Sequence, residues 1–404
     1  MKILKCGKLF DAAAGTVLEN MAVCIEGNKV SAVKPMADVC TEGHEVIDLS
    51  DKFVMPGLID THVHTMSDGS PAAWNITTTG LEGDVAFESY KNAMKDLMAG
   101  FTTIRDESSA HFADVALRDA INAGKVDGPR MFVSGISITA TGGHADGRLA
   151  PFIHDNGNSC FTCNNENETR RAARMNFKYG ADQIKIMATG GVASHGDDPN
   201  ASEFTVEEMK AAIDVAKEVG KLSSAHAHGC NGIKNAIKAG IHSIEHGMLI
   251  DQEGMDMLIE HGTWLVPTIV AAKNIVIFGE GGALPAWMVE KAKLVLVGHQ
   301  KQLMYLRSKG AKIAFGTDAG TGFNFHGEQG VEFQNMLEFG FEPVEILQSA
   351  TVKAAQLLRW EDRVGQLKEG YFADVVAFDS NPLEDMTVMT KSSFVMKDGR
   401  VYKG

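Results

Sequence analysis

The chain has 404 residues, 44% of them hydrophobic, enough for one large barrel with an accessory unit or for two ordinary domains. Its net charge of −14 argues against nucleic acid and anionic membranes as partners, because both require a basic face. The first residues contain no apolar core of signal-peptide length, and no later stretch approaches the roughly 20 apolar residues of a membrane span. We therefore expect a cytoplasmic protein that acts on a small molecule.

The two ends of the chain share a pattern of short strand-like runs. Residues 1–55 contain MAVCIEG, KVSAVK and EVIDL, and residues 364–404 contain ADVVAFD and SSFVMKDGRVYKG, with NK and DG as turn signals. We predict that both termini build one small β-sandwich. Residues 56–363 then form a second domain.

That second domain alternates short β-rich runs with amphipathic helical stretches, as repeated βα units of a parallel sheet do. Each run is apolar at its start and polar at its end, which fits a barrel whose strand ends face a site. The sequence predicts an α/β fold, a (β/α)8 TIM barrel. The eight runs are GLIDTHVH, FTTIRDE, MFVSGISIT, ADQIKIMAT, KLSSAHAHG, HSIEHG, TWLVPTI and KIAFGTDAG.

Helices are predicted between these runs, among them Val85–Ala99, Thr205–Val219 and Trp287–Lys309, where apolar residues recur every three or four positions. The second begins TVEE, a capping box in which Thr205 caps and Glu208 lies three residues on. These helices would form the outer ring of the barrel.

His62 and His64 end the first barrel strand. A strand has a period of two, so both imidazoles point to the same side and can bind one cation. An isolated HxH also occurs by chance, so the pair needs further ligands. Arg105 and Asp106, at the end of the second strand, are interpreted as a structural pair at the rim.

The loop after the third strand, TGGHADGR, carries two candidate substrate ligands. His144 lies among glycines that let the backbone approach a ligand, and Arg148 could hold a terminal carboxylate. The alternatives are loop packing for His144 and solvation for Arg148. Cys160 and Cys163 form a single CxxC in a polar loop, and with no second pair we interpret them as reduced thiols.

Lys185 lies in the fourth strand between Ile184 and Ile186, so it must point into the barrel if the isoleucines face the helices. Burial and adjacent cations depress the pKa of such an amine and free it to react with carbon dioxide. The product is a carbamate that can bridge two metals. The alternative is a lysine paired with an acid such as Asp318.

Histidines also end the fifth and sixth strands, and an aspartate ends the eighth: His226, His246 and Asp318. In a barrel these ends converge on one mouth, where catalytic residues gather. Four histidines and one carboxylate form a ligand set suited to zinc or a neighbouring transition metal.

Two more histidines lie near that mouth. His228 could donate a hydrogen bond to a developing oxyanion, or could merely bond a neighbour. His326, in NFHGE after the eighth strand, is a further candidate for substrate binding.

In these motifs the chain resembles the amidohydrolase superfamily. The resemblance rests on PGLIDTHVH, Lys185 in IKIMATGG, His226, His246 in SIEHG, Asp318 in GTDAG and the terminal ADVVAFD segment. Within the superfamily the chain looks most like the imidazolonepropionase-related group, which includes Xaa-Pro dipeptidases, Xaa-Arg or Xaa-Lys carboxypeptidases and ochratoxin-type amidases. The features are TGGHADG, IKIMATGGV with SHG, and FHGEQ.

The resemblance implies two divalent metal ions, most often zinc. His62, His64 and Asp318 would hold the more buried ion, His226 and His246 the more exposed one, and Lys185, as N6-carboxylysine, would bridge them. One departure concerns His228, which stands where peptidase relatives often carry a tyrosine.

The implied activity is hydrolysis of an amide bond in a dipeptide or N-acyl amino acid by a metal-bridging hydroxide. Asp318 would act as acid and base, and His228 would stabilise the oxyanion. One alternative is hydrolysis of a cyclic amide, as in imidazolonepropionase, although that one-metal enzyme lacks the bridging lysine. Another is a metal-free assembly protein. The expected partners are a small-molecule or dipeptide substrate and further copies of the chain in a homo-oligomer, with no nucleic acid and no membrane.

Overall fold

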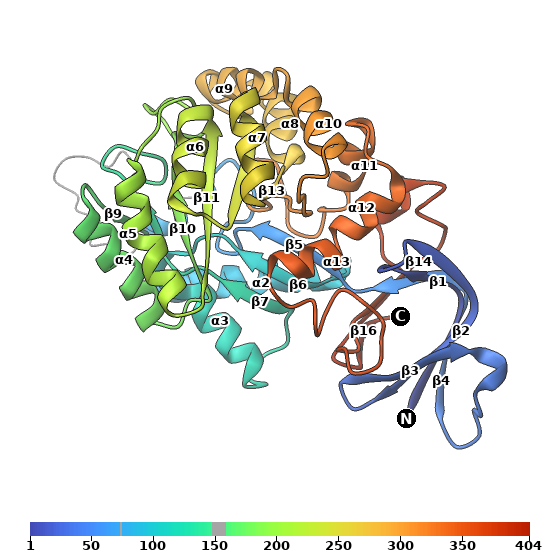
Figure 1. Cartoon of the computed structure of the whole chain (residues 1–404). Helices are drawn as coiled ribbons and strands as arrows, with labels where there is room; N and C mark the ends of the chain where they lie inside the picture. The colour runs from blue at the N-terminus through green and yellow to red at the C-terminus, as the bar shows by residue number, and fades with distance from the viewer. Residues whose placement is uncertain (73–74, 148–158) are drawn as a thin grey trace.

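The structure is a computed structural model that describes residues 1–72, 75–147 and 159–404. Strands from both termini form one seven-stranded sheet in the order β16-β15-β14-β4-β1-β2-β3. In Figure 1 this sheet lies at one side of the molecule, with both chain ends on it. Its strands are β1 (Lys2–Asp11), β2 (Thr16–Glu26), β3 (Lys29–Pro35), β4 (Glu45–Pro56), β14 (Val375–Phe378), β15 (Phe394–Lys397) and β16 (Arg400–Lys403).

Parallel strands in two further sheets form the wall of the barrel. One sheet has three strands in the order β5-β6-β7, and the other has six in the order β13-β12-β11-β10-β8-β9. The strands are β5 (Leu58–Val63), β6 (Phe101–Asp106), β7 (Arg130–Val133), β8 (Ser137–Thr139), β9 (Cys160–Thr162), β10 (Gln183–Met187), β11 (Leu222–Gly229), β12 (Ser243–Leu249) and β13 (Trp264–Val266).

Single backbone contacts connect the two sheets into a ring. Asp182 donates its N–H to Val133 O at 2.8 Å, which joins β7 to the segment that leads into β10. Residues 313–319 pair in parallel with β13 through Leu265 and Ile313, and with β5 through Val63 and Ala319. The predicted barrel is confirmed; its third run is split into β7 and β8, and its eighth is held by isolated bridges.

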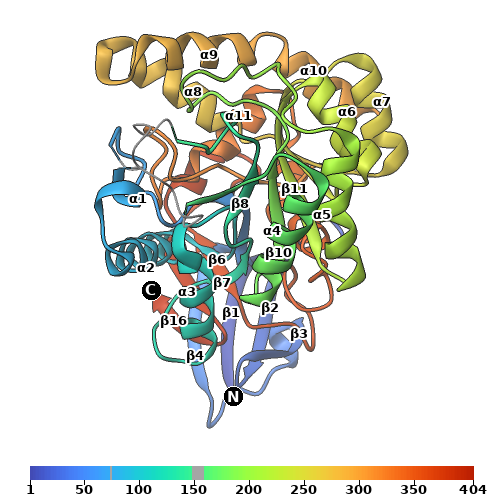
Figure 2. The same ribbon diagram turned by 90° about the vertical axis from the view of Figure 1, so that its left-hand side faces the viewer.

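The helices cover the outside of the barrel and one of its ends (Figures 1 and 2). They are α1 (Ile76–Thr79), α2 (Glu82–Ala99), α3 (Ala113–Asn122), α4 (Glu166–Lys178), α5 (Val206–Glu218), α6 (Cys230–Ala239), α7 (Gln252–His261), α8 (Ile269–Phe278), α9 (Ala286–Leu296), α10 (His299–Ser308), α11 (Val331–Glu338), α12 (Pro343–Ser349) and α13 (Val352–Leu357), with short turns η1 (Met36–Asp38), η3 (Ala110–Phe112), η4 (Gly279–Ala283) and η5 (Met386–Thr390).

Of the predicted helices, the one at Thr205 forms as expected and the one at Trp287 is broken in two. The capping box of α5 is present: Thr205 N donates to Glu208 Oε2 at 2.8 Å, and Glu208 N donates to Thr205 Oγ1 at 3.2 Å. The single helix predicted for Trp287–Lys309 is wrong. Gly298 takes a left-handed φ of 81° and divides that stretch into α9 and α10.

The main hydrophobic core runs through both parts of the molecule. One cluster of buried side chains joins Phe53 and Val376 of the terminal sheet to Leu97 and Phe333 of the barrel helices. The terminal sheet also has a smaller cluster of its own. Among the described residues, no helix combines the length and apolarity that crossing a membrane requires.

Candidate active site

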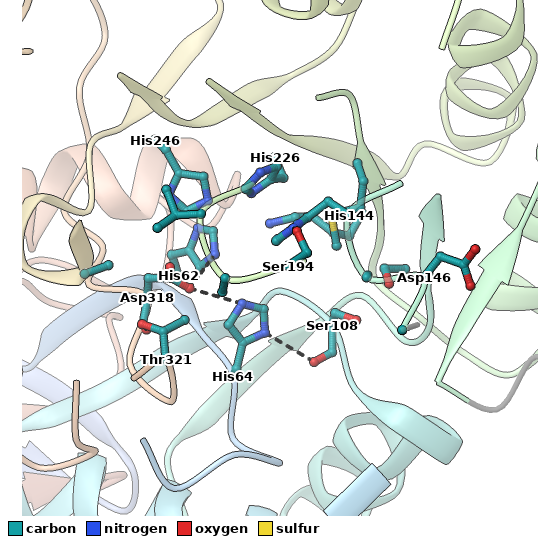
Figure 3. A pocket seen from close by; sticks show the side chains of 18 of the residues that line it. His62, His64, Ser108, His144, Asp146, Ser194, His226, His246, Asp318 and Thr321 are labelled. Carbon is teal, nitrogen blue, oxygen red and sulfur yellow. Dashed lines mark hydrogen bonds and ion pairs between the residues drawn. The ribbon is translucent and has the colours of Figure 1, made fainter. Parts of the chain in front are cut away.

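The residues predicted to bind metal meet in one cavity of about 440 Å³ at the ends of the barrel strands. They come from β5, β10, β11, β12 and the end of the eighth segment. Figure 3 shows the imidazoles and the Asp318 carboxylate pointing toward one another. The lining includes His62, His64, Lys185, His226, His228, His246 and Asp318, and also His144.

His62, His64 and Asp318 form the tightest group. Asp318 Oδ1 lies 3.3 Å from His62 Nε2 and 3.1 Å from His64 Nε2. Burial alone would raise the pKa of Asp318, but the two imidazoles outweigh burial and hold that pKa well below its usual range. The carboxylate is therefore ionised at neutral pH.

A buried carboxylate at the back of the cavity orients His62. His62 Nδ1 donates to Glu245 Oε2 at 2.8 Å, so Nε2 is the nitrogen that faces Asp318. Nε2 is fully buried and faces Asp318 Oδ1 at the ion-pair distance given above, with no closer hydrogen-bond partner among the described residues. The nitrogen that His62 presents to the cavity is therefore Nε2.

Lys185 is buried and lines the same cavity as the histidines. Its Nζ is 3.0 Å from Glu107 Oε2, so its acidic partner in the unmodified chain is Glu107 and not Asp318. Glu107 also accepts hydrogen bonds from Gln183 and Ser224, both at 2.6 Å. Burial opposes ionisation of Glu107, but Arg105 and Lys185 lower its pKa to about 2.

His226, His228 and His246 are packed ring against ring. The centroid of His246 lies 4.7 Å from that of His226 and 5.0 Å from that of His228. Burial, followed by the repulsion of neighbouring cations, lowers the pKa of His228 to about 3 and those of His226 and His246 well below the usual value. All three are therefore neutral imidazoles, the form that binds metals.

Three non-glycine residues at these strand ends have left-handed backbone conformations: His246 with φ 69°, Asp318 with φ 63° and Thr268 with φ 44°. Such conformations cost free energy and cluster at functional sites. His246 Nδ1 and Thr268 Oγ1 share a hydrogen bond of 2.7 Å, which fixes the orientation of the His246 ring. Two of these residues, His246 and Asp318, line the cavity, and Thr268 contacts it through His246.

This donor set fits divalent cations. One nitrogen or oxygen atom each from His62, His246 and Asp318 lies within 4.8 Å of the others. Two ligand atoms at tetrahedral positions around a zinc ion are about 3.3 Å apart when each bond is about 2.0 Å, close to the His62–Asp318 separation. The support of His62 by Glu245 also matches how proteins orient metal-binding histidines.

Of the remaining predicted site residues that the structure describes, only His144 is found in the lining of the cavity. Its ring stacks on His226 at 4.1 Å and its Nδ1 lies 2.6 Å from Ser194 Oγ. Arg148 lies outside the described residues. His326 does not line the cavity: its Nδ1 is 2.9 Å from Asp96 and its Nε2 is 3.1 Å from His64 O.

The interpretation of Arg105 and Asp106 as a pair is also wrong. Arg105 is fully buried and binds Glu107 and Glu245, each at 2.8 Å. Asp106 accepts hydrogen bonds from Thr65 instead. Glu107 and Glu245 were not predicted to support the site. The one signal in the sequence is their position, since Glu107 directly follows β6 beside Asp106 and Glu245 lies inside β12 beside His246.

Comparison with known proteins agrees with this geometry. The model of the family described as "Amidohydrolase family" matches residues 53–402. The chain belongs to the amidohydrolase family. Ochratoxinase of Aspergillus niger is 33% identical over 420 residues, which cover 96% of this chain and 84% of that protein.

Solved structures of other amidohydrolases superpose closely. A Xaa-Pro dipeptidase with methionine bound in its active site is 37% identical, with a TM-score of 0.92 and complete coverage of both chains. A prolidase in complex with N-methylphosphonate-L-proline is 32% identical, with a TM-score of 0.91, over 100% of this chain and 99% of that one. The resemblance predicted from the motifs is confirmed, and the chain is a hydrolase acting on carbon–nitrogen bonds.

Proposed function

We propose that this amidohydrolase uses two metal ions to cleave the amide bond of a dipeptide or N-acyl amino acid, in the manner of a prolidase or carboxypeptidase. The observation that carries the proposal is the convergence of neutral imidazoles, an ionised carboxylate and a buried lysine on one cavity. Its volume of about 440 Å³ is within the range of small-molecule sites, roughly 300–1,000 Å³.

His62, His64 and Asp318 would hold one ion, His226 and His246 the other, and Lys185 as its carbamate would bridge them. When bound, two divalent cations such as zinc activate a water molecule and polarise a carbonyl group. Glu245 and Thr268 would keep the rings of His62 and His246 in place, since each already binds the Nδ1 atom of its histidine.

The chain's own residues would carry the proton and orient the substrate. Asp318 accepts the proton of the attacking water at a carboxylate oxygen and then delivers it to the departing nitrogen; one carboxylate serves both steps because they are sequential. His228 donates to the developing oxyanion. Its Nδ1 has no hydrogen-bond partner among the described residues.

His144 would bind the C-terminal carboxylate of the substrate, because its ring lies beside His226 at the cavity wall. Losing such a contact costs about 2–5 kcal/mol if the partner is desolvated. A good dipeptide should therefore have a higher kcat/KM than its C-terminal amide. Equal values would mean that the site does not recognise a carboxylate.

The direct test is a screen of dipeptides, N-acyl amino acids and small cyclic amides with zinc-loaded enzyme. Hydrolysis of linear amides supports the proposal. Hydrolysis of cyclic amides alone favours the second candidate, since imidazolonepropionase of Fusobacterium nucleatum is 23% identical over 90% of this chain and 86% of that protein.

A second experiment tests the bridging lysine. Lys185→Ala should lose most of its bound metal and nearly all activity, and added short-chain carboxylic acids should restore part of both by filling the vacated space. The control is Lys238→Ala, on the exposed face of α6, which should keep its metal and its activity and should not respond to the added acids. Normal metal content and turnover in Lys185→Ala would contradict the two-metal proposal.

A further inference from the structure

One wall of the cavity is made of apolar side chains. Met248 comes from β12, Val192 from the loop after β10, and Ala271, Ala272 and Ile275 from α8. Behind the wall, Val192, Met248, Ala272 and Ile275 pack with Leu284, Val289, Ala292 and Val295 in a separate hydrophobic cluster. The wall is thus the cavity-facing edge of a packed layer.

The polar side chains of α8 are turned away from this wall. Lys273, the only charged residue of the helix, binds Asn335 at 2.6 Å and Glu338 at 2.5 Å on α11. Asn274 donates to Phe323 O at 2.9 Å. Neither residue lines the cavity, so α8 presents only aliphatic groups to it.

The start of α8 is fixed relative to the proposed metal site. Glu332 accepts hydrogen bonds from the first two amides of the helix, Ile269 N and Val270 N, both at 2.7 Å. The preceding residue, Thr268, bonds His246. Figure 2 shows α8 and α9 together at the end of the molecule opposite the terminal sheet. The wall therefore has a defined position beside His246 before any substrate arrives.

One ionisable group of the cavity lining is close to the wall: His195 follows Val192 in the same loop, and its ring lies 5.2 Å from that of Trp287 in α9. Among the described residues, the ionisable groups that line the cavity are His62, His64, His144, Asp146, Lys185, His195, His226, His228, His246 and Asp318, and none belongs to α8. Most are the metal and catalytic residues of the proposed function. A charged substituent placed against Met248 and Ile275 would lose its water without gaining a partner on the wall, which is strongly unfavourable.

We infer that this wall, formed by Val192, Met248, Ala271, Ala272 and Ile275, selects a substrate with an apolar side chain of leucine, methionine or phenylalanine type and rejects charged ones. The inference rests on the proposed function, since it names the class of dipeptide or N-acyl amino acid that the site takes. An apolar surface gains from burying each added methylene and offers nothing to an ammonium or carboxylate.

The test uses two dipeptide series with alanine held constant at one position, Xaa-Ala and Ala-Xaa, together with N-acetyl-Xaa, where Xaa is Leu, Met, Phe, Asn, Lys or Glu. In at least one series, kcat/KM for the apolar residues should exceed that for Lys and Glu by about 100-fold or more. Charged and apolar residues within about tenfold of each other in every series would overturn the inference while leaving the proposed function intact.

If no linear amide is hydrolysed, the proposed function is wrong. The inferred preference for apolar side chains can still be tested separately, by binding. Thermal-shift binding of the same N-acetyl amino acids then decides the inference alone: stabilisation by the leucine compound but not by the lysine compound supports it, and equal stabilisation overturns it. This measurement needs no turnover.

A matched pair of variants on α8 locates the effect. Ile275→Gln places a polar group on the wall and should lower kcat/KM for the best apolar substrate by about tenfold or more. Ile277→Gln makes the same change two residues on, where the side chain is 58% exposed and does not line the cavity, and should stay within about twofold of wild type. Equal effects of the two substitutions would contradict a role for the wall.

Discussion

At the scale of single residues, the candidate ligands at the strand ends are held by buried charged groups behind them, such as Glu245 at His62 and Glu107 at Lys185. His62, Lys185 and Asp318 are predictable because parallel strands end at one mouth and alternate residues share a face. The bond between Arg105 and Glu245 joins residues 140 positions apart. Such a pairing depends on which strands become neighbours and on which rotamers the core permits, and no local pattern encodes either.

Arg105 is expected to be critical for stability. Arg105→Met leaves Glu107 and Glu245 as buried carboxylates without their shared cation, so the free energy of unfolding should fall by about 3–5 kcal/mol in urea denaturation. The control is Arg363→Met, because that side chain is 46% exposed and, within the described part of the chain, forms an ion pair with its neighbour Asp362 alone; the loss should be below about 1 kcal/mol. Comparable losses in both variants would show that the buried pairs contribute no more than a surface pair.

Asp318 is expected to carry the proton. Asp318→Asn keeps the shape of the side chain but removes its basicity, so turnover should fall by about 10² to 10⁴-fold, the usual contribution of general acid–base catalysis. Metal content, measured on the same preparation, separates loss of the proton carrier from loss of a ligand. Turnover equal to wild type would show that another group takes the proton.

At the scale of elements, local signals predicted the helices themselves better than the breaks between them. The Thr205 capping box is a four-residue pattern and forms as expected. The break between α9 and α10 rests on Gly298, which in sequence lies inside an amphipathic stretch and could equally have remained helical. The start of α8 depends on Glu332, whose place beside it is a tertiary contact that the sequence does not announce.

The contact between Glu332 and α8 predicts a pH dependence of stability. Burial raises the pKa of Glu332 from 4.5 to about 8. The folded chain therefore keeps a proton on Glu332 that the unfolded chain releases. The contribution of this proton to the free energy of unfolding is complete below about pH 4.5 and disappears as the pH rises toward about 8. Glu332→Gln cannot titrate, so its Tm should rise relative to wild type between about pH 5 and pH 8.

The control for that comparison is Glu338→Gln on the same helix, where the side chain is 63% exposed and no such trend is expected. If the Tm of wild type instead rises relative to that of Glu332→Gln as the pH increases, the pKa of Glu332 is lowered by folding and the prediction is wrong. In that case the two amides of α8 would hold the carboxylate ionised in spite of its burial.

At the scale of the whole molecule, the chain termini and the barrel share a core. The sequence predicts that both termini build one small β-sandwich, because both carry short strand-like runs with turn signals, and the structure shows their strands in one seven-stranded sheet. The sequence does not show how far the two parts depend on each other. Phe53 and Val376 pack into the same cluster as Phe101 and Phe333, and Arg130, at the start of β7, binds Asp398 at 2.8 Å.

This shared core predicts that the terminal sheet and the barrel unfold together. Three of the four tryptophans, Trp264, Trp287 and Trp360, are in the described part of the barrel region and none is in the terminal strands, so fluorescence reports the barrel. Hydrogen exchange of peptides from β1 and β2 reports the sheet. In a urea series the two signals should have the same midpoint, although proteins of this size often populate intermediates.

A pair of variants in β4 makes that prediction specific. Phe53→Ala removes a ring from the shared cluster and should lower both midpoints together, with a loss of about 3–5 kcal/mol. Val46→Ala lies in the same strand but is 42% exposed, and should change neither midpoint appreciably. If Phe53→Ala accelerates exchange in β1 and β2 at urea concentrations where the fluorescence still reports a folded barrel, the two parts are separate folding units. If both midpoints shift together, the terminal sheet and the barrel are one folding unit, because the side chains buried between them stabilise both.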